Sequence, residues 1–172
     1  MSQLKVNSIV PVGGLPSGAN GGIIQIRQGI KTDTASTQST TLVDTGLECS
    51  ITPTLNSSKI LVLVTANISG DHVELRIGCG LFRDSTQIFL GDGSGSRIRE
   101  SWQGTGTRDD HQNNVHLSFL DSPATTSAIT YKLKFHQEGG NYNVFINRNP
   151  RDLNNATTGR TASSITLMEV TT

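Results

Sequence analysis

The sequence predicts an all-β protein, an antiparallel β-sandwich of jelly-roll-like type that follows an extended N-terminal arm. Three observations predict this fold. β-Branched residues are abundant and helix formers are scarce, which favours strands. Apolar and polar residues alternate in several segments, as in a strand with one buried face. Eighteen glycines and five prolines recur at short intervals along the 172 residues, as turns between short strands require.

Residues 1–22 are expected to form the arm, and residues 23–172 the β-sandwich domain. Pro11 to Gly22 contains two prolines and five glycines, which exclude a helix and argue against an independent fold. The segment is either a disordered tail or an arm that docks on a neighbouring protein. We favour docking, because disordered linkers tend to be poorer in apolar residues. The arm residues that need burial are Leu4, Val6, Ile9, Val10, Val12 and Leu15.

The first half of the domain contains a central strand. A strand begins at 23–26, and a Thr/Ser-rich extended segment covers 31–44. Another strand, 47–51, ends before Pro53. Residues 60–64 are apolar at every position, which marks a central strand that is covered on both faces. A lone sandwich buries only one face of each sheet, so the second face needs cover from another element or another copy of the chain.

The second half of the domain contains further strands separated by turns. Residues 73–81 alternate most regularly, and a turn at 83–86 returns the chain through 87–90. The remaining strands are expected at 97–103, which carries Ile98 and Trp102, and at 115–119, 129–135 and 165–170. Glu138-Gly139-Gly140-Asn141 is expected to close a hairpin into 142–146. Eight or nine strands without a helix are typical of a sandwich or jelly roll.

Three long polar loops, 91–96, 104–113 and 147–160, are candidates for an outward-facing surface at the end distal to the arm, because connecting segments often carry binding residues. The candidate contact residues in these loops are Asp92, Ser94, Arg108, Asp109, Asp110, His111, Arg151 and Asn154.

Charge and hydropathy narrow the function classes. Fourteen basic and fourteen acidic residues cancel, whereas nucleic-acid binders usually carry a net basic patch, so no nucleic-acid partner is expected. No apolar run approaches the length of a membrane span, so no membrane insertion is expected. The N-terminus lacks the apolar region of a secretory signal, so the chain is expected to be made in a cytoplasm. Cys49 and Cys79 could pair or serve as small buried hydrophobes.

No catalytic, metal-binding or cofactor-binding residue is assigned, and the chain is expected not to be an enzyme. The four histidines, His72, His111, His116 and His136, lack ligand spacing and are interpreted as solvated. A sugar-cleaving site would need facing carboxylates, and the candidates for these are Glu74, Glu100, Asp92 and Asp109. Only 5% of residues are aromatic, which argues against a groove where sugar rings stack.

Several short motifs occur in a fixed order from Leu4 to Glu169. They are LKVNSIVP at 4–11, GGIIQ at 21–25, KTDT at 31–34, ITP at 51–53, SSKILV at 57–62 and LFRDSTQI at 81–88. Together they resemble a family of small tailed-phage fibre or virion structural proteins, common in phages of aquatic bacteria. The resemblance implies a jelly-roll-like homotrimer on the virion, attached through its N-terminal arm, without enzymatic activity.

The sequence and the resemblance leave three functions open. The first is a trimeric tail fibre or appendage that presents its polar loops to a glycan or protein of the host surface. The second is a capsid decoration protein that stabilises the shell by binding the major capsid protein. The third is a carbohydrate-binding or carbohydrate-cleaving module, for which the sequence shows neither converging carboxylates nor an aromatic platform. The first two require other virion proteins as partners.

Overall fold

The computed structural model describes residues 22–107 and 110–171, and these residues form strands and loops without a helix. No helix that could cross a membrane therefore occurs among them. The six arm residues named above, Leu4 to Leu15, lie outside the described residues. The all-β prediction is confirmed.

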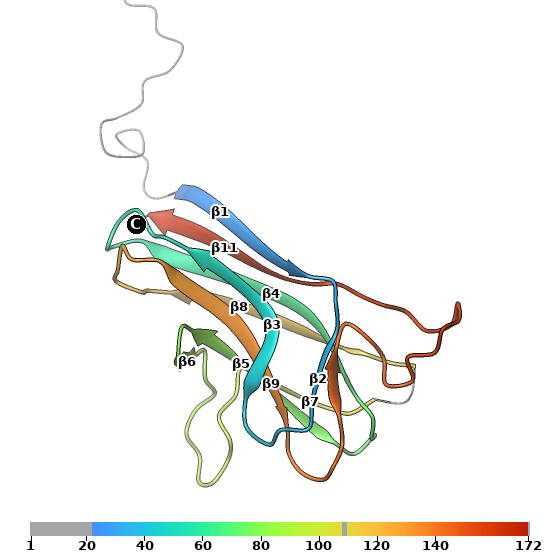
Figure 1. The fold of residues 1–172 in the computed structure, drawn as a ribbon. Helices are drawn as coiled ribbons and strands as arrows, with labels where there is room; N and C mark the ends of the chain where they lie inside the picture. Colours follow the sequence, from blue (N-terminus) through green and yellow to red (C-terminus); the bar gives the residue numbers. More distant parts are fainter. Residues whose placement is uncertain (1–21, 108–109, 172) are drawn as a thin grey trace, which may run out of the picture.

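The strands form two antiparallel sheets packed face to face (Figure 1). Sheet A contains β1 (Gly22–Lys31), β2 (Ala35–Thr37), β4 (Lys59–Gly70), β8 (Asn113–Asp121), β10 (Val144–Ile146) and β11 (Ser163–Thr171). Sheet B contains β3 (Val43–Ile51), β5 (Arg76–Arg83), β6 (Thr86–Ile88), β7 (Trp102–Thr105) and β9 (Ile129–Gln137).

The connectivity is that of a jelly roll. Three pairs of strands each share one strand position in a sheet. β6 and β7 both pair with β5, and β10 and β11 both pair with β4. β1 and β2 pair in turn with β11 and β10, so they also share a position. Sheet A then runs β1, β11, β4, β8, and sheet B runs β3, β9, β5, β6/β7. All but one of the connections between consecutive positions cross from one sheet to the other, as expected for a double-sheet jelly roll.

The core lies between the sheets and follows the period of two along β4. Ile60, Val62 and Val64 are at most 1% exposed and point inward. Leu61 and Leu63 between them point outward and are only half-buried. The central position of this strand is therefore confirmed, since β11 and β8 flank it. None of the residues that the structure describes covers its outer face.

The hairpin predicted at residues 138–141 is wrong. Gly139 and Gly140 do turn the chain with positive φ angles of 132° and 79°. However, Asn143 exchanges hydrogen bonds with Asp71 of the β4–β5 loop, its N donating to Asp71 Oδ1 at 2.8 Å. This contact directs the chain across to sheet A, where β10 pairs with β4 and β2 rather than with β9.

The strand predicted from residue 73 starts later, at Arg76. Residues 71–75 form a loop instead, in which Leu75 N donates to His72 O at 3.1 Å. Val73 is 51% exposed there, whereas Leu75 reaches the core at 4%. The apolar alternation from Ile77 to Leu81 belongs to β5 as expected.

The two cysteines are free thiols, Cys49 on β3 and Cys79 on β5, and both are buried. Burial raises the pKa of the Cys79 thiol, with Glu100 adding to the effect. They therefore serve as small hydrophobic residues of the core.

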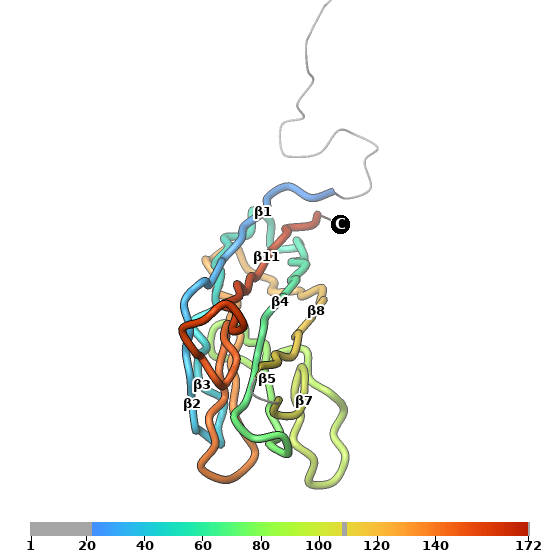
Figure 2. The backbone as a smooth tube through the Cα atoms, turned by 90° about the vertical axis from the view of Figure 1, so that its right-hand side faces the viewer, coloured from blue at the N-terminus to red at the C-terminus, as the bar shows by residue number. Residues whose placement is uncertain are grey.

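The sandwich has two distinct ends (Figures 1 and 2). At the termini end, Gly22 pairs with Thr171, and loop 52–58 is tied to β11 through Glu169. At the opposite end, called the loop end, lie the connections 71–75, 106–107 with 110–112, 138–143 and 147–162. Backbone hydrogen bonds join them, among them Asp71 N to Asn143 O and Thr107 N to Gly70 O. The described part of the chain therefore begins, at Gly22, at the end away from these loops.

Candidate functional site

Two of the three predicted loops meet at the loop end. Arg151 Nη1 lies 3.3 Å from Asp110 Oδ2, and Thr161 Oγ1 donates to Gln112 Oε1 at 2.9 Å. His111 and Asn154 in these loops are exposed, as predicted. Arg108 and Asp109 lie outside the described residues. The structure thus joins residues from 110–112 and 147–162 into one polar surface.

The third predicted loop, 91–96, lies apart from that surface. Asp92 and Ser94 are exposed, and Ser94 O accepts hydrogen bonds from Arg97 N and Nη1, each at 3.2 Å. The end of this segment, from Ser96 to Ile98, borders a hollow against Arg76 on β5. The candidate contact residues therefore fall on two sides of the loop end.

A groove at the loop end extends from the segment Ser96 to Ile98 to loop 71–75. One part, about 530 Å³, is lined by residues of loop 71–75 and of the segment 138–142. Arg76 and Glu138 line this part and also the adjoining hollow beside Ser96. Its wall carries a stacked aromatic pair, His72 and Tyr142, with ring centroids 4.3 Å apart. Sequence reasoning missed this pair, since the two residues lie seventy positions apart.

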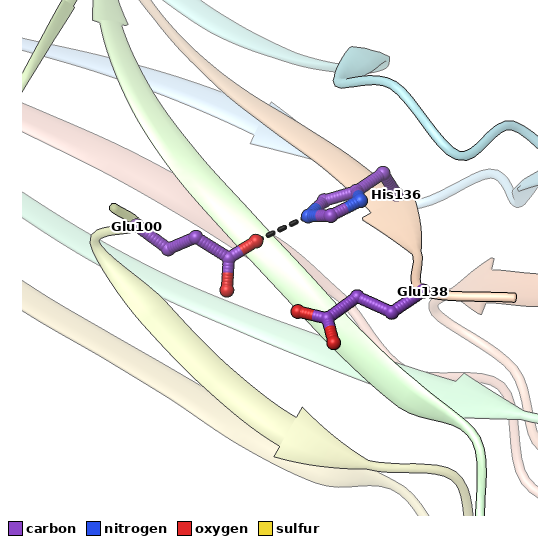
Figure 3. A group of neighbouring side chains, drawn as sticks. All are labelled: Glu100, His136 and Glu138. Atoms are coloured by element: carbon purple, nitrogen blue, oxygen red, sulfur yellow. Dashed lines mark hydrogen bonds and ion pairs between the residues drawn. The ribbon is translucent and has the colours of Figure 1, made fainter. Parts of the chain in front are cut away.

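At the inner end of the groove, Glu100, His136 and Glu138 bring one donor atom each within 4.8 Å of one another (Figure 3). His136 Nε2 is hydrogen-bonded to Glu100 Oε1. The side chains of both are 4% exposed, and that of Glu138 is 16% exposed. The prediction that the histidines are solvated is therefore wrong for His136, although His111 and His116 are exposed.

The sheet itself assembles this cluster. Gly78 on β5 pairs with Gln103 of β7 on one side and with His136 of β9 on the other. Because Gly78 has no side chain, Glu100 fits above it; an added Cβ would collide with Glu100 Oε1 and His136 Nε2. Glu138 follows His136 by two positions, so both point to the outer face of sheet B.

Gln103 holds the two carboxylates. Its Nε2 donates to Glu138 Oε1 at 2.8 Å and to Glu100 Oε2 at 3.3 Å. The hydrogen bond that Glu100 accepts from His136 raises the pKa of His136 above its ordinary value, against the opposing effect of burial. The cluster thus combines two carboxylates and one imidazole, a set that can hold a cation or exchange a proton.

A second unusual surface covers the outer face of sheet A. Four residues in register cross it near the termini end: Ile26 pairs with Met168, Met168 with Leu61, and Leu61 with Leu120. Ile26 and Leu120 are 56% and 47% exposed. Among the outward positions of β1, β11, β4 and β8, only Lys59 carries a full charge at neutral pH. We call this surface the sheet A face.

No protein-family model matches this chain, and no curated protein matches it in sequence. Among solved structures it is similar to three of infectious bursal disease virus: a mutant VP2 protein in derived T=1 particles, the Gx strain, and derived T=1 particles. Each match covers 94% of this chain, with sequence identities of 10%, 10% and 11% and TM-scores of 0.43, 0.44 and 0.44. The chain spans 42–44% of the length of those proteins. Sequence identities and TM-scores this low carry no conclusion about the function of this chain.

Proposed function

We propose that the chain is a non-enzymatic structural protein of a phage particle, a homotrimeric fibre or appendage that contacts the host surface. The sheet A face carries this proposal. It carries a band of exposed apolar residues, and Lys59 is the single full charge among its outward positions. Exposed apolar patches mark interaction surfaces, and the centres of protein interfaces are depleted of charged residues. A second and third copy of the chain would cover it.

The two ends of the sandwich differ, so a trimer would have one end for attachment to the particle and the other for contact with the host. The described part of the chain begins at Gly22, which pairs with Thr171 at the termini end. The apolar residues of the preceding segment, 1–21, would bind a neighbouring virion protein, as the resemblance to tailed-phage proteins implies. The loop end would then point away from the particle. A host surface offers many copies of one receptor, so weak contacts by three chains add up to firm attachment.

The loop end has the features of a contact surface. It carries polar loops with residues of both charges, among them Arg151 and Asp110, and the exposed ring of Tyr142. Tyrosine and arginine are enriched in binding surfaces because they combine apolar contact with hydrogen bonding. This end would therefore contact a glycan or a protein of the host.

The location of the chain on particles tests the proposal. Mass spectrometry of purified virus particles should detect the chain, and gold-labelled antibodies against residues 147–162 should mark the tail. Labelling over the capsid shell would replace the fibre with a capsid decoration protein. Absence of the chain from purified particles would overturn the structural role altogether.

A further inference from the structure

We propose that Glu100, His136 and Glu138 form a binding site for one divalent transition-metal ion, for which Zn²⁺ is the probe. The site lies on sheet B and in the segment before β7, so ion binding requires neither the trimer nor the virion. Its three donor atoms converge within 4.8 Å of one another.

Burial makes this convergence costly without a cation. The carboxylates of Glu100 and Glu138 lie close together with little access to water, and buried charges need partners. Arg76 is the ion-pair partner of Glu138 among the described residues, but its Nη1 is 3.9 Å away and its side chain is 71% exposed. His136 is the partner of Glu100. A dication would neutralise both carboxylates together and leave the imidazole neutral as a ligand.

The surroundings match what a metal site requires around its ligands. Gln103 donates to both carboxylates and so fixes their orientation, as residues behind metal ligands commonly do. His136 Nδ1 is buried and has no hydrogen-bond partner among the described residues. A proton on Nδ1 would leave the lone pair of Nε2 directed at the metal. Because Gly78 has no side chain, Glu100 and His136 can lie directly against its backbone.

The donor set selects the class of ion. One imidazole nitrogen and two carboxylates suit zinc and its neighbours, whereas Ca²⁺ takes six to eight oxygen ligands. Zinc-to-ligand bonds of about 2.1 Å place the ligand atoms about 3.4 Å apart in a tetrahedral site. To reach this geometry the three donor atoms have to rearrange, and the hydrogen-bonded pair of Glu100 Oε1 and His136 Nε2 has to move apart. A fourth position would face the groove and take water or an oxygen of a bound ligand.

The test is a calorimetric titration of the full, untagged chain with ZnCl₂ after EDTA treatment and dialysis. One Zn²⁺ should bind per chain with micromolar or tighter affinity. Glu138→Gln should weaken binding at least 10-fold. Glu48→Gln is the matched control, because Glu48 is an exposed carboxylate on the same outer face of sheet B, and it should leave binding unchanged.

Two further measurements keep the test decisive if a variant folds poorly. X-ray absorption of the zinc-loaded wild-type protein should show one nitrogen and two carboxylate ligands. Zn²⁺ at about 100 times its dissociation constant should raise the melting temperature of the wild-type protein by about 5–10 °C. No binding at about 1 mM Zn²⁺, or equal binding by wild type and Glu138→Gln, would overturn the proposal and leave a buried ion-pair cluster.

Discussion

Replacing Glu169 by glutamine should destabilise the termini end of the domain. Glu169 points inward from β11 and is 0% exposed. Its carboxylate accepts hydrogen bonds from Gln25 Nε2 at 2.5 Å, from Thr54 N at 2.7 Å and from Thr54 Oγ1 at 2.8 Å. These bonds tie the edge strand β1 and loop 52–58 to β11.

The magnitude follows from those contacts. Glutamine has one acceptor oxygen and one NH₂ group, so in either orientation a donor would face Gln25 Nε2 or Thr54 N. At least one hydrogen bond to a charged group is lost and a buried donor is left without an acceptor. Together these changes should lower the free energy of unfolding by about 3 kcal/mol. For a domain of this size the melting temperature should fall by about 6–12 °C.

The effect should depend on pH in a defined direction. Burial alone would raise the pKa of Glu169, but the hydrogen bonds from Gln25 and Thr54 outweigh it and hold the pKa below its ordinary value of 4.5. A group with a lowered pKa in the folded protein stabilises the fold above its unfolded pKa, and this stabilisation is lost as the pH falls through the folded pKa. The difference between wild type and Glu169→Gln should therefore shrink below about pH 4.5.

Thermal unfolding followed by circular dichroism checks this prediction at neutral and acidic pH. Protein concentration has to be equal in all samples, because the melting temperature of an oligomer depends on it. Glu48→Gln, at an exposed position on β3, should leave the melting temperature unchanged. A difference below about 0.5 kcal/mol for Glu169→Gln, or one that persists undiminished at pH 3, would refute the reasoning.

Four further substitutions have expected outcomes in denaturant unfolding. Gly78→Ala should cost about 2–4 kcal/mol, because its Cβ would displace the buried ion pair above it; Gly93→Ala, where a Cβ meets no atom within 4 Å, should be neutral. Tyr131→Phe should cost about 2 kcal/mol, since it removes the buried hydrogen bond to Asp121 Oδ2 at 2.6 Å. Arg151→Ala should cost less than about 1 kcal/mol, because its ion pair is half exposed. Equal effects of the two glycine substitutions, or a larger loss for Arg151→Ala than for Tyr131→Phe, would contradict these assignments.

The sequence was sufficient to predict the fold class because the strands differ sharply from the turns. The apolar positions of β4, from Ile60 to Val64, indicated a central strand whose two faces both need cover. In the part of the chain that the structure describes, the face of Leu61 and Leu63 is the one left without cover. The order in which the strands pair could not be predicted from the sequence. The register of strands far apart in the chain, such as β1 and β11, depends on contacts that periodicity does not reveal.

Two local predictions failed for an identifiable reason. The glycines at 139–140 do turn the chain, but a turn of this kind can close a hairpin or cross between sheets. The hydrogen bonds between Asn143 and Asp71 decide the outcome, and they join residues more than seventy positions apart. The same loop takes Val73 out of the expected strand.

The buried cluster was the part least accessible to sequence reasoning. Glu100 precedes β7 and His136 lies on β9, so they are distant in the sequence. Gly78, which lies between them, has no side chain that could indicate a site. The one available hint was the spacing of His136 and Glu138, which places both on one face of a strand. The burial of His136 arises because the segment before β7 folds over sheet B, which periodicity does not reveal.

The solution mass of the full chain, measured by light scattering with and without Leu120→Glu, tests the central claim most directly. Leu120 lies on the sheet A face and is 47% exposed, so the added charge should spare the fold of one chain. Val73→Glu changes an apolar residue of similar exposure, 51%, outside that face. A mass of about 55 kDa, three times the 18.4 kDa of one chain, is predicted for wild type and Val73→Glu, and dissociation for Leu120→Glu. A monomeric wild-type protein, or a trimer that Leu120→Glu leaves intact, would contradict the account.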